Sequence, residues 1–127
     1  LVPPWNRFAG EFEPLLADAG LVGLSSMAPR RGPAPPSGIA VIDVHVDLVA
    51  WQAGRGFIGP AAALGGILGH LRARRRGATD LAAATGILTH HLVLDDPATD
   101  FLGQLRDLVA AHRGACWSAA AELLRAR

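Results

Sequence analysis

The sequence predicts an α/β protein in which strands and helices alternate around a parallel sheet. Short apolar runs rich in Ile, Leu and Val, which are typical of buried strands, lie at 39–46 and 86–94. Longer segments with a proline in the first turn and helical composition follow them at 60–76 and 96–112. These elements are enough for half of a (β/α) barrel or for a small open sheet, and the alternation alone leaves both open.

The first part of the chain predicts a loop, a helix and a strand. Residues 1–7 form the loop, because two adjacent prolines are incompatible with a helix interior or a central strand. Apolar side chains recur with helical spacing at 8–19, and Gly20 follows them as a typical helix stop. The apolar residues 21–24 predict a short strand.

The middle of the chain predicts a strand, a loop and a long helix. A proline-rich loop at 25–37 leads into the strand at 39–46, which is apolar until polar residues enter near its end. A glycine-rich loop then precedes the helix at 60–76. Arginines gather in the last turn of this helix, where cations interact favourably with the helix dipole.

The last part repeats this order. The strand at 86–94 precedes a helix at 96–112, for which Asp96 is the expected N-cap. A short strand at 115–117 and a final helix capped by Ser118 complete the predicted elements.

Composition indicates one domain without a charge preference for a particular partner. The chain has 127 residues, of which 50% are hydrophobic and 18% charged, and its formal net charge is +1. This balance argues against nucleic acid or an anionic membrane as a partner, and the arginine run at 72–76 is expected to be solvated. No apolar run is long enough for a membrane span and no signal segment is visible, which favours a soluble, cytoplasmic protein. Cys116 is the only cysteine, so an intrachain disulfide is excluded.

Three clusters of polar and aromatic residues lie where strands give way to loops, the position at which side chains of α/β proteins surround ligands. Their members are Trp5, Asn6 and Arg7 near the start, Asp47 and Trp51 after the strand at 39–46, and His90 and His91 within the strand at 86–94. The clusters can converge, because parallel strands end at one edge of a sheet. The plain alternative for the histidine pair is one packed and one solvent-exposed ring, since neighbouring strand residues face opposite sides.

The remaining histidines are given structural positions. His45 and Asp47 are two residues apart on the expected strand and therefore share a side, either as joint members of a site or as a buried hydrogen-bonded pair. His70 and His112 are expected at a helix surface and a helix end.

The three clusters resemble, in this order, the last three motifs of the polysaccharide deacetylases. The matching features are a Pro-Pro-aromatic turn ending at Trp5, an Asp followed by a Trp at Asp47 and Trp51, and a Leu-x-His ending at His90. Members of that family have a distorted (β/α) barrel and use a divalent metal, usually zinc, to remove N- or O-acetyl groups from sugars. The resemblance covers residues 1–117 and implies a partial barrel, an acetylated carbohydrate as substrate, and a metal cofactor.

The resemblance also implies a role for each matching residue. The backbone N–H at Trp5 would help to form the oxyanion hole, because the prolines hold it fixed while charge develops on the carbonyl oxygen. His90 would be the general acid, and a nearby carboxylate would keep its imidazole protonated near neutrality. Asp47 and Trp51 would tune and support this histidine. The residues expected to contact substrate are Trp51, Asn6 and Arg7.

The sequence departs from the family pattern where the family binds its metal. The opening family motifs supply an Asp base, an Asp ligand and two ligands spaced His-x-x-x-His, and the chain contains no such set. Val2 stands where the family usually has an Arg that orients the base, and His91 where an Asp is common. We therefore expect this chain to be the C-terminal half of such an enzyme, to lack its N-terminal part and most of its metal site, and to be inactive alone.

Two other interpretations stay open. The first is a non-catalytic α/β protein that binds a sugar or a partner subunit and kept only the fold. The second is an unrelated zinc hydrolase whose metal ligands are His45, Asp47, His90 and His91, since imidazoles and carboxylates suit zinc. Half a barrel has unpaired strand edges, so self-association through these edges is expected as well.

Overall fold

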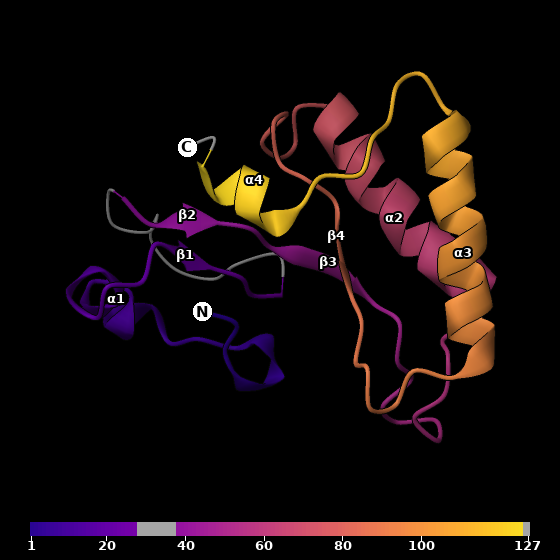
Figure 1. The fold of residues 1–127 in the computed structure, drawn as a ribbon, viewed down its shortest axis with the longest axis horizontal. Helices are drawn as coiled ribbons and strands as arrows, with labels where there is room; N and C mark the ends of the chain where they lie inside the picture. The colour runs from indigo at the N-terminus through magenta and orange to yellow at the C-terminus, as the bar shows by residue number, and fades with distance from the viewer. Residues whose placement is uncertain (28–37, 126–127) are drawn as a thin grey trace.

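The computed structural model describes residues 1–27 and 38–125. Short helices and strands form the first part of these residues, and the two long helices lie in the second part, as Figure 1 shows. In chain order the elements are η1 (Pro4–Asn6), η2 (Gly10–Phe12), α1 (Leu15–Asp18), β1 (Gly23–Leu24), β2 (Ala40–Val41), β3 (Val44–Asp47), α2 (Pro60–Arg75), β4 (Gly86–Leu88), α3 (Asp96–Ala111) and α4 (Ala120–Arg125). Among the described residues, no helix combines the length and the hydrophobicity that crossing a membrane requires.

The strands run parallel and pair in sequence order. β1 pairs with β2, and β3 pairs with β4. A bridge between Met27 and Val44 continues the β1 ladder into β3, so residues 40–47 connect the two pairs. Leu1 lies beside β1, because its amine donates to the Gly23 carbonyl at 2.6 Å and its carbonyl accepts from the Ser25 N–H at 2.9 Å. The described strands do not close into a barrel.

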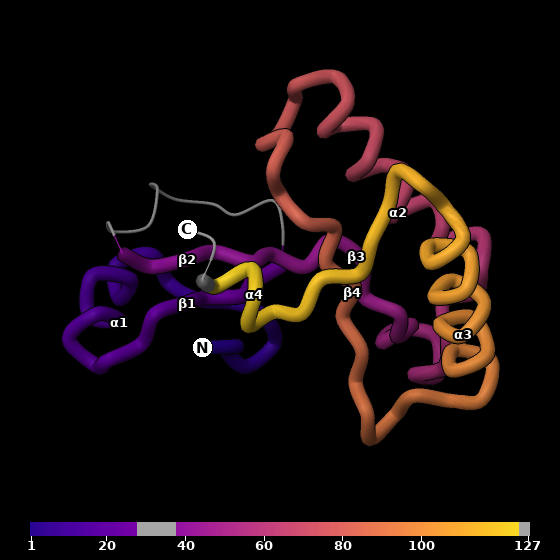
Figure 2. Tube along the Cα trace, turned by 45° about the horizontal axis from the view of Figure 1, so that its top comes forward, coloured from indigo at the N-terminus to yellow at the C-terminus, as the bar shows by residue number. Residues whose placement is uncertain are grey.

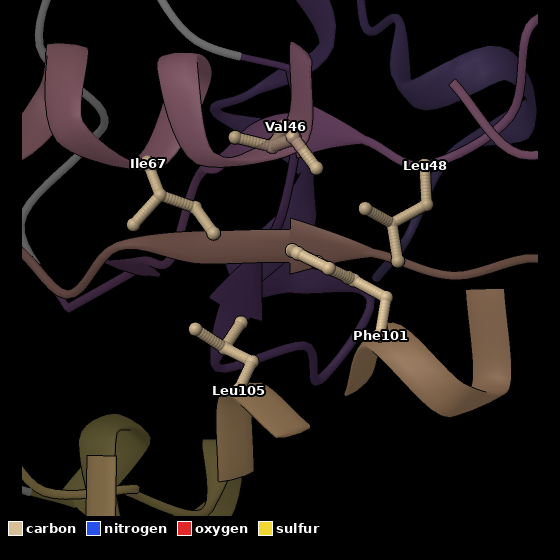
Figure 3. Packing of buried hydrophobic residues seen from close by; sticks show 6 residues of the cluster. Val46, Leu48, Ile67, Phe101 and Leu105 are labelled. Carbon is tan, nitrogen blue, oxygen red and sulfur yellow. The ribbon is translucent and has the colours of Figure 1, made fainter. Parts of the chain in front are cut away.

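Helices α2 and α3 lie side by side on the same side of β3 and β4 in both views of the fold (Figures 1 and 2). Their apolar side chains meet those of β3, and Figure 3 shows Ile67 of α2 and Phe101 of α3 pointing toward Val46 and Leu48. We call this group the main cluster; its buried members are Val46, Leu48, Ala63, Ile67, Phe101 and Leu105. A second, smaller cluster consists of Leu16, Leu24 and Ile39.

The two long helices lie where the sequence predicts them. α2 spans Pro60–Arg75 and α3 spans Asp96–Ala111, within one residue of the expected ends. The N-cap of α3 is Asp95 rather than Asp96, because the Asp95 carboxylate accepts a hydrogen bond from the Ala98 N–H. The prolines at their first turns explain these starts, since proline lacks the N–H that this position leaves unpaired.

The helix expected at 8–19 was wrong. The structure has the 3-10 turn η2 and the four-residue helix α1 in its place. Pro14 interrupts the segment, because a proline inside a helix removes one backbone hydrogen bond and clashes with the preceding turn. The apolar spacing at these positions therefore produces the buried Leu16 without a continuous helix.

The strand expected at 86–94 is shorter, and the strand expected at 115–117 is absent. β4 ends at Leu88. The ladder to β3 stops there, because the Leu48 carbonyl accepts from the Ile58 N–H and not from β4. Residues 91–93 form a turn closed by a hydrogen bond from the Val93 N–H to the His90 carbonyl at 2.8 Å. His90 and His91 thus lie in a loop, so strand alternation does not separate them. Most of the loop expected at 25–37 lies outside the described residues.

A bulge in β3 changes the direction of His45. The ladder to β4 shifts register between Val44 and Val46. His45 stacks on His70 of α2, while Val46 also faces α2, against Gly66. The shared side expected for His45 and Asp47 is not seen, because the bulge breaks the alternation: His45 bonds to the Gly86 N–H, and Asp47 bonds to Trp51 and His90.

Candidate functional site

Asp47 collects three hydrogen bonds at the C-terminal end of β3. Its Oδ2 accepts from the indole N–H of Trp51 at 2.8 Å and lies 3.3 Å from Nε2 of His90. Its Oδ1 accepts from the Val49 backbone N–H at 2.9 Å. Asp47 and His90 are 43 residues apart in sequence. The carboxylate of Asp47 therefore joins two of the three clusters found in the sequence.

The Asp47–Trp51–His90 group is compact and accessible. The Trp51 and His90 rings meet edge to face, with centroids 4.7 Å apart. The side chains of His90 and Asp47 are 28% and 21% exposed, so water and a ligand can reach them. Asp47 bonds to Nε2 of His90, and no partner among the described residues takes Nδ1. A neutral or protonated His90 can therefore present Nδ1 to a ligand while Asp47 fixes the other nitrogen.

Trp51 is positioned by a folded-back loop at 48–58. Val49 pairs with Phe57 in an antiparallel bridge, and the Ala50 N–H donates to the Gly56 carbonyl at 2.8 Å. Arg55 has a φ of 63°, in the left-handed region, which lets the loop reverse direction tightly. The loop holds Trp51 beside His90, and the residues Ala50, Trp51, Gln52 and Ala53 line a shallow, open depression there.

The turn at Pro3–Arg7 is fixed, but it stands apart from this group. The Asn6 N–H donates to the Pro3 carbonyl, and the Asn6 carbonyl accepts from the Met27 N–H, which anchors the turn at the C-terminal end of β1. In both views the turn and the loop after β4 lie below the strands (Figures 1 and 2). Within the described residues no contact joins Trp5 to Asp47 or His90.

Several features of the turn suit ligand binding. Trp5 and Asn6 both have a φ of 53°, a strained conformation for residues other than glycine. The Trp5 ring is 88% exposed, whereas Asn6 is buried and its Oδ1 has no hydrogen-bond partner. The Trp5 N–H bonds to no acceptor among the described residues, and Arg7 has an exposed side chain.

His45 and His70 form a second polar pair, which the sequence did not predict. Their rings stack with centroids 3.5 Å apart. His45 Nδ1 accepts from the Gly86 N–H at 3.1 Å, and His70 Nδ1 lies 2.9 Å from Thr85 Oγ1. His70 was expected at the helix surface, but it is only 9% exposed. His112 does lie at the end of α3, as expected.

We expect the stacked pair to make the fold sensitive to acid. Burial and the nearby charges of His70 and Arg74 lower the pKa of His45 to about 4 from its ordinary 6.5. Burial and Arg74 lower the pKa of His70 as well. Between pH 6.5 and about 4, His45 binds a proton in the unfolded chain but not in the folded one. The contribution of His45 to the free energy of unfolding is therefore complete above pH 6.5 and is lost as the pH falls toward 4.

Urea unfolding at pH values from 7 to 4.5 measures this effect. After allowance for partial exposure, His45 is expected to account for a loss of about 1–2 kcal/mol. His45→Gln keeps an acceptor for the Gly86 N–H but does not titrate, so it should flatten the pH dependence. His91→Gln, at an exposed position, is the matched control and should leave it unchanged. An equal pH dependence in wild type and His45→Gln would contradict the prediction.

The described residues do not fit a metal site. No three or more His, Cys, Asp or Glu side chains in the described part of the chain are grouped so that they could hold an ion. The four ligands of the zinc-hydrolase interpretation are divided: His45 faces α2, Asp47 bonds His90, and His91 is exposed. The structure therefore does not bring these four side chains together as one ligand set.

Comparison of the chain with models of protein families, with curated proteins and with solved structures finds no match.

Proposed function

We propose that this chain is the C-terminal half of a hydrolase of the polysaccharide deacetylase type, which removes acetyl groups from a carbohydrate. The observation that carries the proposal is the hydrogen-bonded contact of Asp47 with Trp51 and His90. These residues come from two of the three motifs on which the resemblance rests. The proposal includes a partial (β/α) barrel, with the parallel strands β1 to β4 as its last part.

In this proposal His90 donates the proton that the leaving amine or alcohol needs. Asp47 bonds to Nε2, so Nδ1 is the nitrogen that faces the substrate. A general acid acts in its imidazolium form, in which Nε2–H bonds to Asp47 and the proton on Nδ1 is the one that is donated. The Trp51 and Val49 N–H groups hold the carboxylate in place, which limits its movement when His90 loses its proton.

Trp5 contributes a backbone N–H to the oxyanion that develops on the acetyl carbonyl. Two prolines and the Asn6–Met27 hydrogen bond fix the turn in advance, so the amide does not have to reorganise during the reaction. Arg7, which is exposed on the same turn, contacts the sugar, and the buried Asn6 holds the turn in place through its bond to Met27. The metal of the intact enzyme, zinc in this proposal, is held by residues other than those described.

The second candidate is a carbohydrate-binding protein without catalysis. The exposed rings of Trp5 and Trp51 favour it, since the flat apolar faces of sugars stack on such rings. This candidate needs neither the Asp47–His90 contact nor a metal.

Acetate release distinguishes the two candidates. The full-length protein, supplied with Zn²⁺, is incubated with N-acetylated and O-acetylated oligosaccharides, and free acetate is measured. We expect acetate from one of these classes, a strong loss after chelation, and none from residues 1–127 alone. Binding of both acetylated and deacetylated sugars without any acetate release would overturn the proposed hydrolase and support the binding protein.

A further inference from the structure

We propose that Asp95 is a positioning residue that ties the loop bearing Trp51 to the loop bearing His90. The sequence suggested only that an aspartate at this place caps a helix. The structure gives each carboxylate oxygen its own donor, and the two donors belong to different segments. The catalytic consequence of this inference rests on the proposed function, but the tie between the loops does not.

The first oxygen of Asp95 begins α3. Oδ1 accepts from the Ala98 N–H at 2.9 Å, the usual bond of an N-cap. The Asp95 carbonyl also accepts from Thr99, through its backbone N–H at 3.0 Å and its hydroxyl at 3.1 Å. Asp95 is therefore held firmly at the end of the loop 89–95.

The second oxygen reaches a segment 38 residues away in sequence. Oδ2 accepts from the Phe57 N–H at 2.9 Å. Phe57 pairs with Val49 and packs against Phe101 of α3, with ring centroids 5.2 Å apart. It thus lies at the base of the loop 48–58, and Trp51 lies near the tip of that loop.

The Asp95 carboxylate therefore connects the two loops that carry Trp51 and His90, the two ring side chains that bond to Asp47. The loop 48–58 carries Trp51, and the loop 89–95 carries His90. The hydrogen bonds from the Phe57 and Ala98 N–H groups lower the pKa of Asp95, so it is ionised near neutrality and both oxygens accept. Capping alone does not require two oxygens, because Ser and Asn are equally good caps.

Two substitutions separate the cap from the tie. Asp95→Ser keeps a cap oxygen but has no second oxygen for Phe57. Asp95→Asn keeps the cap and turns an amide N–H₂ toward the Phe57 N–H. Asp96→Ser, at the exposed next position, is the matched control. Hydrogen exchange of the Trp51 indole N–H, identified by its loss in Trp51→Phe, is measured by NMR together with the helix content by circular dichroism.

We expect Asp95→Ser and Asp95→Asn to keep the helix content and to speed indole exchange about tenfold, as loss of a hydrogen bond to a charged acceptor does. Asp96→Ser should change neither. Wild-type exchange rates in both Asp95 variants would overturn the tie and leave a simple cap. Indole exchange is measured without substrate, so it does not depend on the proposed activity. If the Asp95 variants exchange faster but the wild-type protein releases no acetate, the tie is supported and only its catalytic consequence is removed.

Discussion

In the proposed deacetylase, replacing His90 by alanine is expected to lower the rate of acetate release by ~10²–10⁴-fold, the contribution that general acid catalysis makes. The loss follows from the contact with Asp47, because alanine leaves the carboxylate without the imidazole that it orients. The bound metal should stay at its wild-type level, since His90 faces Asp47 rather than a group of ligands. Steady-state kinetics and metal analysis of the same preparation provide both measurements.

His91→Ala is the matched control for this prediction. His91 is exposed and, in the described part of the chain, makes no hydrogen bond or ring contact with the Asp47–Trp51–His90 group, so its removal should cost far less activity. Equal losses from both substitutions would contradict the assignment of His90 as the acid. Loss of metal in His90→Ala would show instead that His90 is a ligand in the complete protein.

Gly86→Ala is expected to destabilise the fold by about 2–4 kcal/mol, because the new methyl group meets backbone that cannot move aside. A Cβ at Gly86 would lie against the Asp43 carbonyl oxygen and 2.8 Å from the Cα of Val44. The strands β3 and β4 would have to separate at the bulge, and the Gly86 N–H would lose its bond to His45. Chemical denaturation gives the change in the free energy of unfolding.

Gly103→Ala provides a control of opposite sign. Gly103 lies inside α3, and a Cβ there meets nothing within 4 Å. Alanine should therefore stabilise the protein by about 0.5–1 kcal/mol through its higher helix propensity. If Gly86→Ala does not lower the free energy of unfolding, as is expected for Gly103→Ala, then β3 and β4 do not approach each other as closely as described.

The parts of the fold that could be predicted from sequence are those with strong local signals. α2 begins at Pro60, α3 has Pro97 in its first turn, and both carry apolar residues over four turns, so both ends were predictable. The meeting of Asp47 and His90 was predictable for a different reason. Parallel strands that follow one another in a βα unit end at the same edge, whatever the details of their packing.

The rest depends on contacts between distant segments. β4 ends at Leu88 because the Leu48 carbonyl accepts from the Ile58 N–H rather than from β4, and no residue of 86–94 encodes that change of partner. His70 is buried because the His45 ring stacks on it, and His45 lies at the bulge in β3. No glycine or proline marks this bulge in the sequence. The second bond of Asp95 depends on the position of Phe57. Pro14 is the exception, because its effect on the expected helix was visible in the sequence.

The separation of the apolar residues into two clusters has a consequence for the order of folding. The main cluster is built from β3, α2, β4 and α3, which follow one another in the chain, so its loops are short and cheap to close. The smaller cluster joins Leu16 and Leu24 to Ile39 through elements of two to four residues. We therefore expect Asp47, Trp51 and His90 to come together with the main cluster, and the turn at Trp5, which bonds to Met27, to become ordered with the smaller cluster.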